Sequence, residues 1–359
     1  MLKTYIIAEA GVNHNGDISL ALQLIDAAYS AGADAVKFQT FNANKLVTAH
    51  AKQADYQLTN TKKEESQLNM LKRLELSYES HKMLISYCEK LGIEFMSTAF
   101  DNESLEFLVS DLKLKNLKIA SGEITNAPLL LQHARTNCNL ILSTGMASLS
   151  EIENALAVIA FGFLNEKDIN PSIDAFHSAY YSPSGQNALK EKVTLLHCTT
   201  EYPAPIDDIN LKAIDTLSSA FKLPVGYSDH SEGIIIPIAA VSRGAIIIEK
   251  HFTLDKNMEG PDHKASLEPD ELSSMIKAIR AVEKALGNGI KGPQPSEIKN
   301  KLVARKSIIA ARMIKEGQII STDDLIIKRP GTGMSPYSYW SLINKASKNS
   351  YNPGDIINE

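Results

Sequence analysis

Short apolar runs alternate with longer amphipathic stretches from the first residues of the chain to about residue 287. The runs are rich in Val and Ile and are bounded by Gly, Pro or polar residues. This pattern is typical of strands that are buried on both faces of a parallel sheet. Eight strands are predicted, beginning at Thr4, Ala35, Ile93, Leu117, Leu140, Val193, Pro224 and Ala245.

The stretches between these runs repeat apolar residues every three or four positions, as amphipathic helices do. Helices are predicted over 18–31, 149–160 and 269–286, the second with a capping box of Ser148 and Glu151. Eight strand–helix units in this length predict a (β/α)₈ TIM barrel. The alternative is a doubly wound open sheet. However, no G-x-G-x-x-G follows the first strand, and polar residues follow nearly every strand.

Two connections are long. Residues 42–77 follow the second strand, at the face where the loops of a barrel build active sites, and they are predicted to form a lid with a helical segment near 64–74. Residues 163–190 follow the fifth helix and therefore belong to the opposite face. Their Pro, Ser, Gly and Tyr content predicts a surface excursion without chemistry.

The composition changes after the predicted barrel, which covers 1–287. Residues 288–303 contain Gly and Pro and are predicted as a linker, and 304–359 contain short Ile-rich strands and turns. A unit of this size is only marginally stable by itself, and we therefore expect it to pack on another surface. It contains Arg329, just before a Pro-Gly bend.

Charge and cysteine content exclude several classes of protein. The formal net charge is −5, so no basic field is available for nucleic acid or an anionic membrane. The three scattered cysteines are typical of reduced thiols rather than of a disulfide framework. The longest apolar stretch, 233–241, is too short to span a bilayer, and the N-terminus lacks the pattern of a signal peptide. We expect a soluble cytoplasmic protein.

Two predicted strands end in histidines with charged neighbours, in Ser228-Asp229-His230 and Glu249-Lys250-His251. Because the carboxyl ends of parallel strands meet at one edge, the two imidazoles are predicted to share a divalent metal. The alternative is that both histidines only bond to backbone carbonyls.

Lysines inside predicted strands indicate an anionic partner, because a buried ammonium is costly unless it is paired. Lys37 and Lys118 are such residues, and Ser121 and Ser143 follow nearby strands. Together they predict a phosphate or carboxylate site. For each lysine alone, a salt bridge to an internal glutamate such as Glu123 is the alternative.

Common catalytic motifs are absent from the sequence: there is no G-x-S-x-G, Walker or C-x-x-C segment. A metal held by two imidazoles suits the polarisation of a carbonyl. An anionic small molecule beside that carbonyl indicates carbon–carbon bond formation.

Nine segments carry a resemblance to a known family: AEAGVNHNG, AVKFQTF, KIASGE, LSTGM, LLHCTTEYP, GYSDHS, EKHFTLD, GPDHKASLEP and KRPGTG. In this order and spacing they closely resemble the bacterial sialic acid synthase family, which includes N-acetylneuraminate, legionaminate and pseudaminate synthases. The match runs nearly end to end, and the C-terminal part resembles the antifreeze-like (SAF, β-clip type) domain of the family.

The resemblance implies condensation of phosphoenolpyruvate with the open-chain aldehyde of N-acetylmannosamine, with release of phosphate by C–O cleavage. It implies a divalent metal, Mn²⁺ by preference and Mg²⁺ or Co²⁺ as alternatives. The closest alternative is legionaminate synthesis from 2,4-diacetamido-2,4,6-trideoxymannose.

The resemblance also implies a role for each matching residue. His230 and His251 would ligate the metal, Glu123 would transfer a proton and Glu9 would orient a metal-bound water. Phosphoenolpyruvate would be bound by Lys37, Lys118, Ser121, Ser143, Thr200 and Ser228, and the sugar by Gln39, Tyr202, Asp262 and Arg329. Two features depart from the family: Thr200 stands where many members have asparagine, and 163–190 is longer than usual.

Family members are domain-swapped homodimers, which implies that the small domain caps the partner's active site and brings Arg329 to it. Three rival functions stay open at this point. One is a Schiff-base aldolase that uses Lys37, Lys118 or Lys250. Another is a non-catalytic sugar- or ice-binding protein. The third is a synthase for a phosphorylated aldose, for which the sequence offers no second basic cluster.

Overall fold

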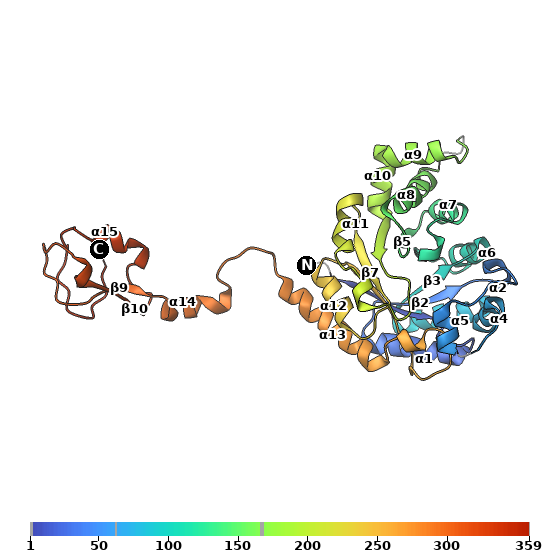
Figure 1. The fold of residues 1–359 in the computed structure, drawn as a ribbon, viewed down its shortest axis with the longest axis horizontal. Coiled ribbons are helices and arrows are strands. Elements are labelled where there is room, and N and C mark those ends of the chain that lie inside the picture. The colour runs from blue at the N-terminus through green and yellow to red at the C-terminus, as the bar shows by residue number, and fades with distance from the viewer. Residues whose placement is uncertain (1–2, 62, 166–168, 359) are drawn as a thin grey trace. The chain divides into compact units, whose positions relative to one another are not determined.

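The computed structural model describes residues 3–61, 63–165 and 169–358 (Figure 1). They divide into two compact units, Met1–Gly287 and Asn288–Glu359. None of the helices within these ranges is both long and apolar enough to cross a membrane.

The first unit is built around a closed barrel of eight parallel strands (Figure 1). Each strand pairs with the next in sequence, and the last pairs with the first, so that Tyr5 lies opposite Ile247. The strands are β1 (Tyr5–Gly11), β2 (Ala35–Thr40), β3 (Glu94–Ala99), β4 (Asn116–Ile119), β5 (Asn139–Ser143), β6 (Val193–His197), β7 (Val225–Asp229) and β8 (Ile247–His251). The predicted barrel is confirmed, and the open sheet is wrong.

Helices surround the barrel: α1 (Ile18–Ala31), α5 (Tyr78–Leu91), α6 (Asn102–Glu106), α7 (Ala127–Arg135), α8 (Leu149–Leu164), α11 (Ala213–Phe221), α12 (Ile235–Ser242) and α13 (Pro269–Leu286). The bounds of α1 and α13 are as predicted. Helix α8 keeps the predicted capping box but continues to Leu164, where Asn165 ends it in the left-handed conformation. The apolar pattern continues through Phe161, which is buried.

The barrel interior is filled by one apolar layer, made of Ile7, Ala35, Met96, Ile141, Leu196 and Ile247. Successive side chains of a strand point to opposite faces. The residues two positions farther along therefore also face the interior, at the carboxyl ends of the strands. They include Glu9, Lys37, Thr98, Ser143 and Glu249. This register explains why polar residues gather above the apolar layer.

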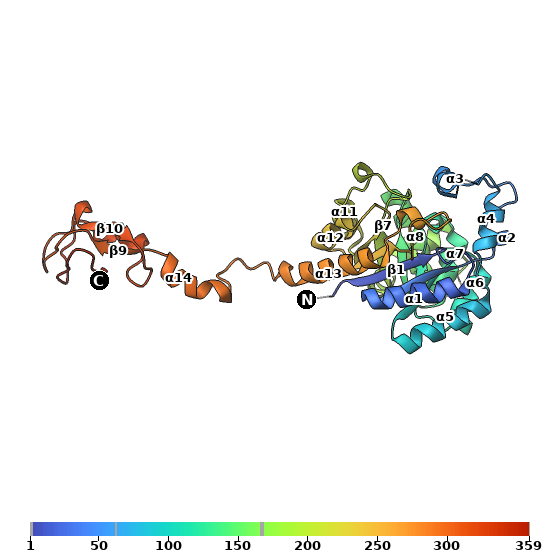
Figure 2. The same ribbon diagram turned by 90° about the horizontal axis from the view of Figure 1, so that it is seen from below.

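The predicted lid contains α2 (Ala43–Leu46), α3 (Asp55–Thr61) and α4 (Gln67–Leu74), and Figure 2 shows α3 and α4 at the edge of the first unit. Helix α4 begins later than predicted, because Ser66 accepts a hydrogen bond from the amide of Asn69 and caps it. Helix α3 is tied to the loop after β8, since the side chain of Asn60 donates to the carbonyl of Pro261 at 2.7 Å. Residue 62 lies outside the described residues.

The long connection after α8 forms two helices, α9 (Ile173–Tyr181) and α10 (Pro183–Lys192). Both pack against α8, and the rings of Phe161 and Phe176 meet edge to face at 5.3 Å. The sequence predicted only a surface excursion here. Residues 166–168 of it lie outside the described residues.

The second unit has an apolar core of its own, made of Ile308, Ala310, Ile314, Ile320, Leu325, Leu342, Tyr351 and Ile357. It contains α14 (Ile298–Ala304), β9 (Ser307–Ala310), β10 (Leu325–Lys328) and α15 (Tyr339–Leu342), and the two strands pair antiparallel. Because α14 covers 298–303 of the predicted linker 288–303, the end of that linker is helical.

Candidate active site

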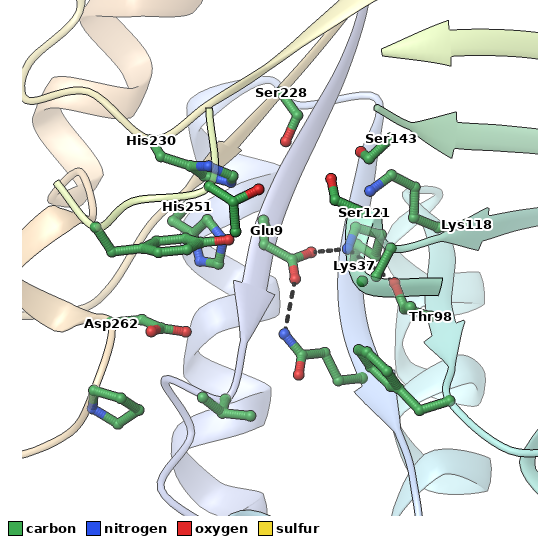
Figure 3. Close-up of a pocket in the computed structure, with 18 of the residues that line it drawn as sticks. Glu9, Lys37, Thr98, Lys118, Ser121, Ser143, Ser228, His230, His251 and Asp262 are labelled. Carbon is green, nitrogen blue, oxygen red and sulfur yellow. Dashed lines mark hydrogen bonds and ion pairs between the residues drawn. The ribbon is translucent and has the colours of Figure 1, made fainter. Parts of the chain in front are cut away.

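A cavity of about 210 Å³ opens at the carboxyl ends of the barrel strands. Figure 3 shows Glu9 near its centre, with His230, His251 and Asp262 on one side and Lys37 and Lys118 on the other. The predicted residues that line it are Glu9, Lys37, Gln39, Lys118, Ser121, Ser143, Thr200, Tyr202, Ser228, His230, His251 and Asp262. Most sequence-predicted site residues therefore lie around one cavity.

Two lysines and two glutamates form a buried ion-pair network, which we call the lysine–glutamate cluster: Glu9, Lys37, Lys118 and Glu249. Lys37 Nζ lies 2.6 Å from Glu9 Oε2 and 3.6 Å from Glu249 Oε2, and Lys118 Nζ lies 3.1 Å from Glu249 Oε1. All four side chains are at most 5% exposed. The predicted alternative of salt bridges to internal glutamates is therefore confirmed for both lysines, with Glu9 and Glu249 as the partners in place of Glu123.

The two glutamates of the cluster titrate differently. Burial raises the pKa of Glu9 to about 7, against the opposing effect of the Lys37 ammonium. Burial also acts to raise the pKa of Glu249, but Lys118, Lys37 and the Ser228 hydroxyl together hold it below its ordinary value. Ser228 Oγ donates to Glu249 Oε1 at 2.8 Å. The lysines therefore favour the ionised form of Glu249, whereas burial makes Glu9 the more readily protonated of the two glutamates.

Hydroxyl groups beside the lysines are free to meet a ligand. Ser143 Oγ and Thr200 Oγ1 are buried and have no hydrogen-bond partner among the described residues. Leaving such groups unpaired costs free energy, so they indicate a ligand with acceptor oxygens. Ser121 Oγ accepts from the amide of Gly145 at 3.0 Å. A Cβ atom on Gly145 would lie 2.2 Å from Thr200 Oγ1, so only glycine fits there.

The two histidines lie side by side, with ring centroids 5.5 Å apart. His230 Nδ1 lies 2.6 Å from the carbonyl oxygen of Thr199, so this nitrogen carries the proton and Nε2 keeps its lone pair. His251 Nδ1 is buried without a hydrogen-bond partner in the described structure. Burial lowers the pKa of His230 to about 4 and that of His251 well below its usual value. Both imidazoles are therefore neutral.

These neutral imidazoles fit a divalent metal, because each offers a nitrogen lone pair toward the same cavity. In the described ranges, however, no group of three or more His, Cys, Asp or Glu side chains is close enough to hold an ion. A metal bound here would take its other ligands from water or a substrate. The bond of His230 to the Thr199 carbonyl agrees with the alternative that the histidines only bond to backbone carbonyls, but it leaves Nε2 available for a metal.

The remaining polar residues lie on the histidine side of the cavity. The ring of Tyr202 lies 4.2 Å from that of His230 and 5.0 Å from that of Tyr56 on α3. Gln39 Nε2 donates to Glu9 Oε1 at 3.5 Å. Burial raises the pKa of Asp262 to about 6. This side offers hydrogen-bonding groups without a fixed positive charge.

Two predicted site residues do not line this cavity. Glu123 ends a short 3-10 turn after β4, and its carboxylate accepts from the side chain of Asn126 at 2.7 Å instead. Proton transfer by Glu123 therefore stays a prediction. Arg329 is exposed and belongs to the second unit, so its role stays a prediction.

Sequence reasoning missed Glu249 and Thr98. Glu249 bridges Lys37 and Lys118, and Thr98 Oγ1 accepts from Lys37 Nζ at 3.2 Å. A signal was present, because Glu249 stands two residues before His251 in a strand and must share its inward face.

Lys250 faces away from the cavity, because it is one position out of phase with Glu249 and His251. Its Nζ lies 2.6 Å from Asp229 Oδ2, and both side chains are fully buried. It also donates to the carbonyl of Ser231. Lys250 therefore cannot be the nucleophile of an aldolase in this cavity.

Comparison with known proteins assigns the chain to a family. The model of the NeuB family matches residues 24–291. The chain belongs to the NeuB family. This NeuB-family chain is 50% identical to an N,N'-diacetyllegionaminic acid synthase of Campylobacter jejuni, over all of both chains. It is 45% identical to an enzyme of the same name from Legionella pneumophila, covering 98% of this chain and 93% of that one.

A solved structure with the same fold is the N-acetylneuraminic acid (sialic acid) synthetase of Leptospira borgpetersenii in complex with citrate. It is 36% identical with a TM-score of 0.67, and the match covers 83% of this chain and 90% of that chain. This NeuB-family chain is thus an enzyme of the sialic acid synthase type. The family resemblance of the sequence is confirmed.

Proposed function

We propose that the chain condenses phosphoenolpyruvate with 2,4-diacetamido-2,4,6-trideoxymannose to give N,N'-diacetyllegionaminic acid and phosphate. The observation that carries this choice of sugar is the 50% identity, over the whole length, to the Campylobacter jejuni enzyme of that name. N-acetylmannosamine, the first expectation from the sequence, becomes the second candidate. The similarity to the Leptospira borgpetersenii synthetase supports it.

Phosphoenolpyruvate would bind at the lysine side of the cavity. Lys37 and Lys118 are the cations available there, and Ser143 and Thr200 have hydroxyls to donate. Ser121 and Ser228 would complete this site. Because both ammonium groups already contact carboxylates, the incoming anion must share or replace those contacts.

His230 and His251 would hold a divalent metal, Mn²⁺ by preference, with Mg²⁺ or Co²⁺ as alternatives. Such an ion, when bound, would polarise the aldehyde oxygen of the sugar as a Lewis acid. The Thr199 carbonyl fixes the ring of His230 and leaves Nε2 for the ion. Gln39, Tyr202 and Asp262 would orient the sugar beside it.

We assign proton transfer to Glu9 rather than to Glu123. A group whose pKa lies near 7 both accepts and releases protons readily at neutral pH, and burial gives Glu9 this property. Glu9 would accept the proton of the water that adds to carbon 2 of phosphoenolpyruvate. Lys37, at 2.6 Å, would keep its carboxylate oriented.

The second unit would be an antifreeze-like (SAF) domain of a cytoplasmic, domain-swapped homodimer. In that arrangement it caps the active site of the partner chain, and Arg329 binds an anionic or acetamido group of the substrates. The exposure of Arg329 on its own unit supports this role.

Phosphate release from phosphoenolpyruvate, measured with Mn²⁺ for each candidate sugar, tests the function. We expect release with the diacetamido sugar, loss of release with a chelator, and recovery when Mn²⁺ is added back. His230→Ala and His251→Ala should each reduce the rate at least about 100-fold, on the scale of losing a metal ligand or its support. His177→Ala on α9, outside this cavity, is the matched control.

Two results would contradict the proposal. Release with N-acetylmannosamine alone would replace the legionaminate assignment by the neuraminate one. Activity that resists the chelator and is lost on borohydride reduction would favour a Schiff-base aldolase through Lys37 or Lys118.

A further inference from the structure

One side of the cavity is apolar and contrasts with the charged ends of the barrel strands. Five residues form it, and we call them the apolar wall: Val12, Met70, Leu71, Leu74 and Phe100. They come from the loop after β1, from α4 and from the residue after β3. None of the five side chains carries an N–H or O–H group. The wall therefore offers a ligand contact surface without hydrogen bonds.

The apolar wall is part of a packed core and not a set of loose side chains. Val12, Met70 and Leu74 are buried together with Phe41 and Ala43, and Leu71 and Phe100 pack against them. The rings of Phe41 and Phe100 meet edge to face at 6.2 Å. The one weak acceptor in the wall, Met70 Sδ, already lies 3.4 Å from the side-chain nitrogen of Gln53. Its side chains are thus held by contacts with one another and with this core.

The proposed reaction fixes which end of the sugar meets this wall, and the inference rests on that proposed function. The aldehyde must lie between the two histidines and the lysine side, because there it meets phosphoenolpyruvate. The far end of the open chain, with carbon 6, then extends away from the strand ends toward the lid. Helix α4 of the lid supplies Met70, Leu71 and Leu74 to the cavity.

We propose that the apolar wall selects acceptors with a methyl group at carbon 6 over acceptors with a hydroxymethyl group there, and that Leu71 is a specificity-determining residue. A hydroxyl pressed against this wall would lose its hydrogen bonds to water and gain none. A methyl group loses nothing and buries apolar surface. Leu71 is only half-buried in the wall, so its side chain is open to the ligand and tolerant of change.

The test uses two acceptors that differ at carbon 6 alone: 2,4-diacetamido-2,4,6-trideoxymannose and the same sugar with a carbon-6 hydroxyl. The wild-type chain should prefer the methyl compound about tenfold or more in kcat/KM, the scale of one group in an apolar pocket. In Leu71→Gln the preference should fall by about tenfold, because the amide gives the hydroxyl a partner. The KM for phosphoenolpyruvate should stay unchanged.

Leu68→Gln is the matched control, since Leu68 lies on the same helix and packs against the same core but does not line the cavity. It should keep the wild-type preference. An equal preference in the wild-type chain, or no change in Leu71→Gln, would overturn the inference while leaving the synthase assignment intact. If neither diacetamido sugar reacts, the proposed function fails, and N-acetylmannosamine and its 6-deoxy form give the same comparison. If the chain does not prefer the 6-deoxy form over N-acetylmannosamine, the inference is overturned as well.

Discussion

At the scale of single residues, Glu249 joins the two lysines of the site. It is a buried carboxylate that contacts both lysines and the Ser228 hydroxyl. A phosphoenolpyruvate molecule in the cavity would offer the same lysines a second anion. Glu249 and the substrate therefore have partly interchangeable electrostatic roles.

Replacing Glu249 by glutamine tests this interchange. Glu249→Gln leaves two buried ammonium groups with one carboxylate, and should lower the free energy of unfolding by about 3 kcal/mol. Bound phosphoenolpyruvate should restore part of this loss. Phosphoenolpyruvate is therefore expected to raise the unfolding temperature of Glu249→Gln more than that of the wild-type chain. Glu123→Gln, outside the cavity, is the control, and equal shifts in both chains would refute the idea.

The sequence predicted site residues well where strand periodicity decides their direction. Lys37 and His251 lie on strands, and their inward orientation follows from alternation. Glu249 follows the same alternation, but the prediction named only His251, two residues later in the strand, as a site residue. Glu123 lies in the 3-10 segment after β4, where the alternation of strand side chains no longer holds. Its side chain bonds to Asn126, which no spacing rule predicts.

At the scale of elements, a buried ion pair fixes the segment that follows β7. Lys250 on β8 pairs with Asp229 at the end of β7 and also donates to the carbonyl of Ser231. Tyr227 OH donates to Asp229 Oδ1 at 2.9 Å. His230 stands between these anchored residues. The pair thus holds the backbone of a proposed metal ligand from the outer side of the barrel.

A double-variant cycle tests this anchoring. Asp229→Asn leaves a buried, unpaired ammonium and is expected to cost about 3–5 kcal/mol of unfolding free energy. The combined change with Lys250→Met removes both charges and should cost less than Asp229→Asn alone. Urea unfolding measures the free energies of Asp229→Asn, of Lys250→Met and of the double variant. A double variant as unstable as the sum of the singles would show that the two residues act independently.

Element bounds followed the sequence where local signals are strong. Helices α1 and α13 end at glycines and match the prediction. Helices α9 and α10 were not predicted, because Pro183 and the adjacent Ser, Gly and Tyr residues indicate a loop. Packing against α8 stabilises both helices, and this tertiary contact overrides the local preference for a loop.

At the scale of the whole molecule, the two units have separate cores and separate stabilising ion pairs. In the second unit Asp324 is almost completely buried, and Arg312 Nε donates to its Oδ1 at 2.6 Å. This hydrogen bond from Arg312 lowers the pKa of Asp324 to about 2. Because the folded pKa is below the unfolded value, the pair stabilises the unit above about pH 4, the ordinary pKa of an aspartate. The contribution is lost as pH falls toward 2.

Asp324→Asn should therefore weaken the second unit at pH 7 by on the order of 1 kcal/mol, a modest value because Arg312 is largely exposed. As pH falls through 2, the difference between the variant and the wild-type chain should shrink. Urea unfolding, followed by the fluorescence of Trp340, the one tryptophan of the chain, reports on this unit. Asp323→Asn, an exposed neighbour, is the control, and a difference that does not shrink with falling pH would contradict the assignment.

Fold prediction succeeded at this scale because eight buried strands with helices between them admit few closed arrangements. The composition change after Gly287 coincides with the division into two units. The helical character of 298–304 was missed, because the Gly and Pro residues just before it indicate a linker.

The lysine–glutamate cluster has a consequence for how an anion enters the cavity. Its two ammonium groups are already paired with Glu9 and Glu249. An arriving phosphate therefore exchanges with these fixed carboxylates rather than with dissolved chloride. Because few dissolved ions are released in this exchange, substrate affinity should depend less on ionic strength than binding to surface lysines does.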